Sequence, residues 1–115
     1  MSGYRRFVAY VYEYQKQKKG SNRGFVRVEN KNGICRFQLQ LQCPGLIGQM
    51  PCTIYGFIRN KDGIEGIPIG ICMTQKDEFR WEMEAKDGQM GKSRRKLEDF
   101  GGMVFRTEGG RFYAT

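Results

Sequence analysis

The sequence contains no histidine. This absence removes the commonest general base and the commonest metal ligand in proteins. No cysteine lies in a catalytic-cysteine signature, and the glycine-rich stretch 63–70 lacks the lysine of a phosphate-binding loop. The chain also lacks an apolar run long enough to span a membrane, and residues 1–14 do not resemble a signal peptide. We therefore predict no catalytic residue, no cofactor, no metal site and no membrane partner.

Cysteine is present but is not arranged for zinc or redox chemistry. The four cysteines are Cys35, Cys43, Cys52 and Cys72, and no two of them form a CxxC pair. Cys35 and Cys43 share the parity of an apolar strand face, which suits free cysteine as a small buried hydrophobe. Free buried thiols predict a cytoplasmic protein, and a disulfide or metal role for the cysteines stays as the alternative.

The composition is that of one folded domain with a local excess of positive charge. At 115 residues with 39% hydrophobic and 13% aromatic content, the chain suits a single core and is too apolar for disorder. Residues 1–59 carry ten basic and two acidic side chains, whereas residues 60–115 carry ten of each. The whole net charge of +8 therefore lies in the first half.

Apolar and polar residues alternate along most of the chain, which is typical of half-buried strands. Asn32-Gly33 and Asp62-Gly63 are tight hairpin turns, and Pro44-Gly45 ends a strand. The stretch 4–14 is apolar on both faces, which indicates a long strand shared between two packing surfaces, or one that wraps a corner of a barrel. We predict an all-β domain over residues 1–115, a small antiparallel barrel or barrel-like sandwich of six to eight short strands, with at most one short helical turn within 92–100. The expected strands are 4–14, 23–30, 34–43, 52–60, 64–74, 78–86, 102–107 and 111–115.

The strand 64–74 has an unusual composition. Gly66, Pro68 and Gly70 fall on one face with Cys72, and isoleucines fall on the other. Proline lacks a backbone donor and favours an edge strand, and small side chains leave that edge unprotected. We predict a strand-pairing interface at Gly66, Pro68 and Gly70, with a close contact inside the barrel as the alternative. The expected core is Val26, Val28, Phe37, Leu39, Leu41, Ile54, Ile67, Ile69, Ile71, Phe79, Trp81, Met83, Val104 and Phe105.

Two basic clusters suggest contacts with phosphates or another anionic polymer. The first lies in the first hairpin and the second in a late loop, and they would form one basic rim if they met in space. Exposed tyrosines on a basic strand face would add stacking surfaces, as in oligonucleotide-binding barrels. The cluster residues are Lys16, Lys18, Lys19 and Arg23, then Lys92, Arg94, Arg95 and Lys96. The candidate stacking residues are Tyr4, Tyr10, Tyr12, Tyr14 and Tyr55.

Three stretches together show a family resemblance: 4–12 (YRRFVAYVY), 24–29 (GFVRVE) and 97–103 (LEDFGGM). They resemble the N-terminal region of a family of uncharacterised proteins from gut clostridia, a domain of unknown function. The resemblance covers most of the chain and implies a bacterial, cytosolic protein with a further part after this region. It carries no functional residue.

We predict a non-enzymatic binding or scaffolding module, whose partner is a protein or its own C-terminal region. Nucleic-acid or anionic-polymer binding through the two basic clusters is the alternative. The lack of a catalytic constellation and the bare strand 64–74 favour the first prediction. The chain would then be the N-terminal part of a longer protein.

Overall fold

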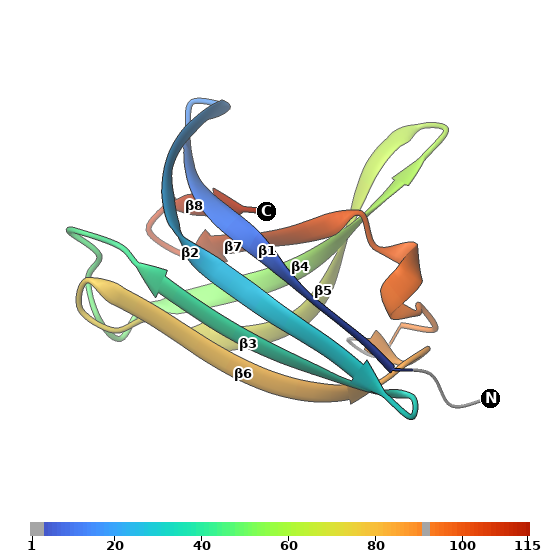
Figure 1. Cartoon of the computed structure of the whole chain (residues 1–115). Helices are drawn as coiled ribbons and strands as arrows, with labels where there is room; N and C mark the ends of the chain where they lie inside the picture. Colours follow the sequence, from blue (N-terminus) through green and yellow to red (C-terminus); the bar gives the residue numbers. More distant parts are fainter. Residues whose placement is uncertain (1–3, 91–92) are drawn as a thin grey trace.

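The computed structural model describes residues 4–90 and 93–115, and they form an antiparallel, all-β barrel that is nearly closed (Figure 1). The predicted fold class is confirmed. The helical turn predicted within 92–100 is the short 3-10 helix η2 (Leu97–Asp99). The strands are β1 (Tyr4–Gln15), β2 (Lys18–Lys31), β3 (Ile34–Gln42), β4 (Pro51–Asn60), β5 (Gly63–Met73), β6 (Glu78–Lys86), β7 (Gly102–Thr107) and β8 (Phe112–Ala114).

The eight strands form one sheet in the order β5-β4-β7-β8-β1-β2-β3-β6. The sheet curls until its two edge strands, β5 and β6, approach each other. Across this seam the Cys72 thiol lies 3.5 Å from the backbone carbonyl oxygen of Arg80. A short bridge joins Gln75 to Glu78 where the chain turns from β5 into β6. The seam is therefore closed by side chains and by one turn rather than by a ladder of backbone hydrogen bonds.

The register across β1, β2, β3 and β6 arranges opposed residues in rows that explain the alternating sequence. One row runs from Ala9 through Val26 and Leu39 to Trp81, and it faces the barrel interior. An outer row three positions along the strands carries charge and includes an ion pair of 2.5 Å between Arg36 Nη2 and Glu84 Oε1. Since opposed residues share a face, one polar row and one apolar row alternate along the sheet. The outer row is Arg6, Glu29, Arg36 and Glu84.

Most of the predicted core is buried, and two members of it, Ile71 and Val104, are wrong. Ile71 is 68% exposed, because a bulge between Ile54 and Tyr55 of β4 leaves Ile69 as an extra residue on β5. An extra residue reverses the alternation beyond it, so Ile69 and Cys72 point inward while Ile71 points outward. The buried members are Val26, Val28, Phe37, Leu39, Leu41, Ile54, Ile69, Phe79, Trp81 and Phe105. Ile67 and Met83 are partly buried and pack against the core. Val104 is not part of the core, because Met103 and Phe105 on either side of it take the inward face of β7.

The first hairpin is longer and tighter than the sequence predicts. Its turn consists of Lys16 and Gln17, both with positive φ, and β2 already begins at Lys18. Two register shifts follow in β1, and the hairpin curls away from the barrel (Figure 1). Gly24 sits at this bend, where a Cβ atom would overlap the carbonyl oxygen of Gln40. Only glycine lets β2 lie this close to β3 at that point.

Two irregular segments cover the ends of the barrel. Leu46, between β3 and β4, is buried at one end, whereas its neighbour Ile47 is exposed. At the other end, Leu97 and Phe100 of the segment between β6 and β7 pack against the core. The backbone N–H of Leu97 donates to Asp87 Oδ1 at 2.7 Å, which ties this segment to the end of β6. Within residues 4–90 and 93–115 there is no helix long and apolar enough to cross a membrane.

Candidate binding sites

β1 is paired on both sides over only a short part of its length. β2 pairs with it from Tyr4 to Gln15, but β8 pairs only with Tyr12–Tyr14. Among the described residues, no strand pairs with the β8 side of residues 4–10, which we call the unpaired segment of β1. Figure 1 shows β1 continuing toward the N-terminus beyond the point where β8 ends. Alternate backbone groups of a strand point to each side, so this segment presents free donors and acceptors.

Side-chain exposure shows that the barrel wall is open beside this segment. Phe7, Val28 and Phe37 form one inward-facing row across β1, β2 and β3. Val28 and Phe37 are each 2% exposed, whereas Phe7 is 37% exposed. The three side chains have the same orientation and similar apolar character. The difference therefore arises because no strand of the described chain covers the far side of Phe7.

An apolar cavity of about 120 Å³ lies inside the barrel at this opening. β1 contributes Phe7 and Ala9 to its lining, and β7 contributes Gly102 and Met103. The rest of the lining comes from β2, β3, β4, β5, the segment around η2 and Thr115. Its other members are Val26, Val28, Phe37, Gly56, Ile69, Leu97, Phe100, Gly101 and Thr115. A concave apolar space beside an unpaired strand edge is a site that can receive a side chain from a docked segment.

The last residue, Thr115, marks one boundary of the opening. Its backbone N–H donates to the carbonyl oxygen of Met103 at 3.1 Å. Its side-chain Oγ1 accepts a hydrogen bond of 3.0 Å from the backbone N–H of Met103. Thr115 therefore continues the pairing of β8 with β7. The next strand position, between β1 and the start of β7, is vacant among the described residues.

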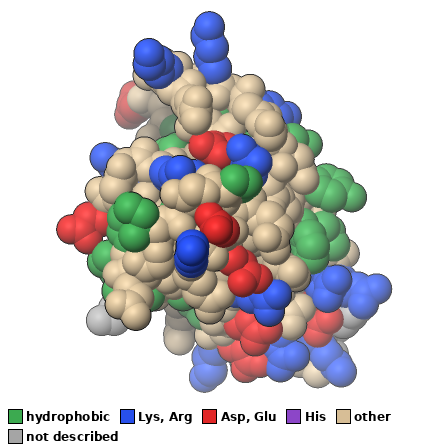
Figure 2. Space-filling view, turned by 90° about the vertical axis from the view of Figure 1, so that its left-hand side faces the viewer, with side chains coloured by type: hydrophobic (Ala, Val, Ile, Leu, Met, Phe, Trp, Pro, Cys, Tyr) green, Lys and Arg blue, Asp and Glu red, His purple; other side chains and the backbone are tan. Residues whose placement is uncertain are grey.

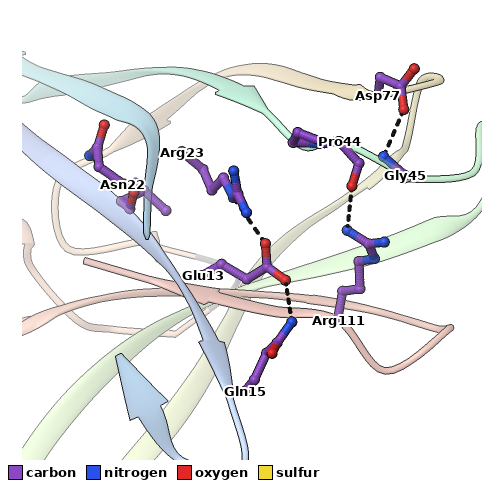
Figure 3. Close-up of polar contacts among 9 residues, drawn as sticks. Glu13, Gln15, Asn22, Arg23, Pro44, Gly45, Asp77 and Arg111 are labelled. Atoms are coloured by element: carbon purple, nitrogen blue, oxygen red, sulfur yellow. Dashed lines mark hydrogen bonds and ion pairs between the residues drawn. The ribbon is translucent and has the colours of Figure 1, made fainter. Parts of the chain in front are cut away.

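The opposite end of the barrel, which we call the polar end, holds a buried ion pair (Figure 3). Glu13 points inward from β1 and is only 7% exposed. Arg23 Nε donates to Glu13 Oε1 at 2.9 Å, and Gln15 Nε2 donates to Oε2 at 3.2 Å. Arg23 points inward because it is the extra residue at the bulge of β2, between Asn22 and Gly24. The bulge thus supplies the cation that makes a buried carboxylate tolerable.

A second arginine and a tyrosine complete the polar end. Arg111 Nη1 donates to the carbonyl oxygen of Pro44 at 3.0 Å (Figure 3). The Tyr113 hydroxyl is buried and has no hydrogen-bond partner among the described residues. The Cys43 thiol and Arg111 lie close enough to act on this phenol but outside hydrogen-bonding geometry. Burial, followed by the nearby Cys43, raises the pKa of Tyr113 well above its usual range, so the phenol stays protonated.

The thiols of this barrel are suited to packing rather than to nucleophilic attack. All four cysteines are free, as predicted. Burial raises the pKa of Cys35 to about 11 and that of Cys52 to about 12, and it also raises the pKa of Cys43 and Cys72. A nucleophilic cysteine needs a lowered pKa so that the thiolate is present. In the described part of the chain, no group of three or more acidic or cysteine side chains could hold a metal ion.

The structure brings the first basic cluster together. Lys16, Lys18, Lys19 and Arg23 line one open cleft of about 510 Å³ on the β1–β2 hairpin, and Glu13 is also part of its lining. Figure 2 faces this end of the molecule and shows Lys and Arg side chains projecting at the top, where the hairpin lies. Arg23 is partly neutralised by Glu13, so the three lysines carry the free charge of the cleft.

The second basic cluster lies at the other end of the barrel. Arg94, Arg95 and Lys96 are exposed and precede Leu97, which is bound to Asp87 at the end of β6. Asp87 also accepts a hydrogen bond from Asn30, near the far end of β2 from Lys18. Lys92 lies outside the described residues. The two clusters therefore do not meet, and they form no common basic rim (Figure 1).

The predicted strand-pairing residues occupy two different surroundings. Gly66 and Pro68 are exposed on the outer edge of β5, where β4 is the paired neighbour in the described chain. Gly70 instead faces Trp81 of β6, and a Cβ atom there would lie 3.0 Å from the indole ring. Gly70 thus makes the close internal contact that was the alternative to an interface.

The aromatic residues predicted to stack lie mainly on the outer face of the barrel. Tyr10 is 62% exposed, and its opposed neighbour across β2 is Phe25. Lys19 Nζ lies 3.9 Å from the centre of the Tyr12 ring, which is a cation–π contact. Tyr14 and Tyr55 are partly buried, and the side chain of Tyr4 lies outside the described residues. Only Tyr10 among them offers a largely free ring.

Sequence reasoning missed both the opening beside β1 and the buried Glu13. Apolar and polar residues alternate in the same way whether a strand has one neighbouring strand or two. The alternation therefore does not indicate that one side of β1 is unpaired. The available signal was the apolar character of both faces of residues 4–14. Searches of protein-family models, of curated proteins and of solved structures found no match to this chain.

Proposed function

We propose that this protein is a non-enzymatic binding module of a larger bacterial protein. Its site is the unpaired segment of β1, and its ligand is an extended segment of a partner protein, which adds to the sheet as a further strand. The observation that carries this proposal is the coincidence of a free backbone edge with an apolar cavity at the same opening. The raised pKa values of the thiols and the lack of histidine support the non-enzymatic part.

Strand addition suits this site for two physical reasons. The free N–H and C=O groups of residues 4–10 can pair with any extended backbone, which supplies affinity without regard to sequence. The exposed apolar side chains Phe7, Val8 and Tyr10 lose contact with water when a strand covers them. A partner segment would thus satisfy backbone groups and bury apolar surface in one step.

Peptide binding followed by amide hydrogen exchange tests this proposal. Extended peptides of about ten residues, with alternating Thr and Val and a lysine at each end, serve as probes at up to about 1 mM. We expect slower exchange at those amides of residues 5–10 that point away from β2, and unchanged exchange on the outer edge of β5 at Gly66. Exchange that stays unchanged at residues 5–10 with every peptide would refute the proposal. Protection confined to β5 would place the site at the other edge and would refute it as well.

A second candidate function rests on the cleft of the β1–β2 hairpin. Three lysines that form no ion pair among the described residues lie there beside the ring of Tyr12 and near the exposed Tyr10. This arrangement supports binding of a single-stranded nucleic acid or another anionic polymer, with phosphates on the lysines and a base on the tyrosine.

Charge reversal at each end of the barrel tests this candidate with a matched control. Changing Lys16, Lys18 and Lys19 to Glu should abolish binding of random single-stranded DNA at low salt. The same change at Arg94, Arg95 and Lys96 should leave most of the binding, because these residues lie at the far end. Affinity should fall steeply with salt concentration in the unmodified protein. Absence of binding at low salt, or equal loss in both variants, would rule out the hairpin as a nucleic-acid site.

A further inference from the structure

The opening beside β1 has a defined register, and from it we infer a side-chain preference for the segment that binds there. We infer that the residue opposite Ala9 carries a large apolar side chain, which occupies the cavity. This inference rests on the proposed function. It adds which chemistry the site selects, and at which position of the bound strand.

The register follows from the strand that already occupies the neighbouring position. Phe112 of β8 lies opposite Tyr14, and Ala114 lies opposite Tyr12. Thr115 therefore falls opposite Val11. A segment that continues the line of β8 places its successive residues opposite Tyr10, Ala9, Val8 and Phe7 in turn. This segment is antiparallel to β1, as β8 is.

The alternation of side chains then decides which positions face the interior. Tyr113 is buried inside the barrel, and Thr115 lines the cavity, so both point inward. The positions opposite Ala9 and Phe7 share that orientation, because side chains of a strand alternate between its two faces. The positions opposite Tyr10 and Val8 point outward, beside two exposed side chains.

The two inward positions differ in the space that they offer. At Phe7 the β1 side chain is itself large and takes up room at the opening. Ala9 carries only a methyl group, and it lines the cavity of about 120 Å³ together with Val26 and Met103. A residue opposite Ala9 can therefore place a leucine-sized or phenylalanine-sized group in the cavity.

The lining also excludes polar side chains at this position. Its side chains are apolar apart from Thr115, whose Oγ1 is already bonded to Met103. A buried amide, hydroxyl or charge opposite Ala9 would have lost its water without gaining a partner, which is unfavourable. The position opposite Val8 remains in solvent, so it should accept polar and apolar residues alike.

A set of fusions that append six residues directly after Thr115 tests the inference at high effective concentration. The second appended residue lies opposite Ala9, and the third lies opposite Val8 as the matched control. The other appended residues are Thr. The second residue is varied among Ala, Leu, Phe and Asn, and the third is varied in the same way in a separate series. Hydrogen exchange at residues 5–10 reports whether the strand has added, and the melting temperature reports the side-chain preference.

We expect Leu or Phe as the second residue to raise the melting temperature above that with Ala by about 5 °C or more. With Asn as the second residue, the melting temperature should be equal to or below that with Ala. Changes of the third residue should alter the melting temperature by less than about 2 °C. The variant Ala9→Leu fills the cavity with a side chain of β1 itself. In this variant, Leu as the second appended residue should no longer raise the melting temperature, and Ala should be favoured instead. Separate peptides with Leu or Phe at this position should likewise bind more tightly than the same peptide with Ala.

The possible failures separate the inference from the proposed function. Protection of residues 5–10 with no dependence on the second residue would overturn the side-chain preference and leave strand addition standing. A preference at the third residue instead would overturn the register. Absence of protection in every fusion and with every peptide would overturn strand addition itself. Protection in the fusions alone would overturn a partner protein as the source of the strand.

Discussion

The two halves of β1 differ in how many strands pair with them. Near Glu13 it has a neighbour on each side, and this charged side chain is 7% exposed. Near Phe7 it has one neighbour in the described part of the chain, and this aromatic side chain is 37% exposed. The carboxylate is thus better buried than the phenyl ring on the same face of the same strand. Burial here is decided by closure of the sheet around a position rather than by the hydrophobicity of the residue.

The largest expected effect compares two phenylalanines of one inward-facing row. Phe37→Ala should lower the free energy of unfolding by about 3–5 kcal/mol, because it removes a fully enclosed ring and leaves a cavity. Phe7→Ala should cost less than about 1.5 kcal/mol, since the ring is partly in water and the wall beside it is open. Urea unfolding measured for both variants checks the difference. Equal costs would mean that the wall is closed at Phe7, which contradicts the opening.

The second comparison concerns the two partners of the buried ion pair. Arg23→Met should cost about 2–3 kcal/mol, because the Glu13 carboxylate stays buried without its cation. Glu13→Gln should cost less, about 1 kcal/mol, because the amide can still accept a hydrogen bond from Arg23 and carries no charge. Chemical denaturation of both single variants and of the double variant gives these values. A larger loss for Glu13→Gln than for Arg23→Met would contradict this account of the polar end.

The strands themselves follow from local rules, and the error at Ile71 arises where one residue is inserted. The row from Val26 to Trp81 is predicted correctly, because alternation and turn residues specify it. Ile71 is predicted on the wrong face, because the bulge at Ile69 reverses everything beyond it. A bulge depends on how two distant strands fit together, and its glycine and proline neighbours indicate only that some irregularity is present.

The candidate sites depend even more on long-range pairing. The cleft of Lys16, Lys18 and Lys19 is recognisable from sequence, because its members lie in one hairpin. Whether Arg94 and its neighbours join them depends on the path of the chain over the whole barrel, which local patterns do not contain. The opening beside Ala9 depends on the length of β8 relative to β1. No property of residues 4–11 alone reports that length.

A smaller effect is expected in the pH dependence of the free energy of unfolding. The comparison is between two thiols, one at each end of the barrel. Cys35 lies near Asp87, at the end of the barrel that has the opening beside β1. Cys52 lies opposite Cys72 at the polar end. Their pKa values rise from 9.0 to about 11 and about 12, mainly through burial. Above about pH 9 the unfolded chain loses these thiol protons while the folded chain keeps them. The stability is therefore fully present below that pH and declines as the pH rises toward the folded-state values.

Replacing either thiol should make this decline less steep. In urea unfolding between about pH 8 and about pH 10.5, Cys35→Ala and Cys52→Ala should each lose less stability with rising pH than the unmodified protein. The comparison uses the slope with pH, so the constant cost of each small cavity drops out. An unchanged slope in both variants would show that these thiols titrate in the folded protein as they do in the unfolded chain.

The smallest expected effect concerns Tyr113. Its hydroxyl group tests whether the polar end is a connected hydrogen-bond network or an ion pair beside an isolated phenol. This oxygen is buried without a hydrogen-bond partner in the described chain, so it contributes desolvation cost and no compensating bond. Tyr113→Phe keeps the ring that fills the barrel and should change stability by no more than about 0.5 kcal/mol, or raise it slightly. Arg111→Met provides the matched control, since it removes the bond to Pro44 and not the phenol. A loss above about 1 kcal/mol for Tyr113→Phe would show that the hydroxyl is bonded in solution, through a water or through Cys43. The polar end would then be a connected network rather than an ion pair beside an isolated phenol.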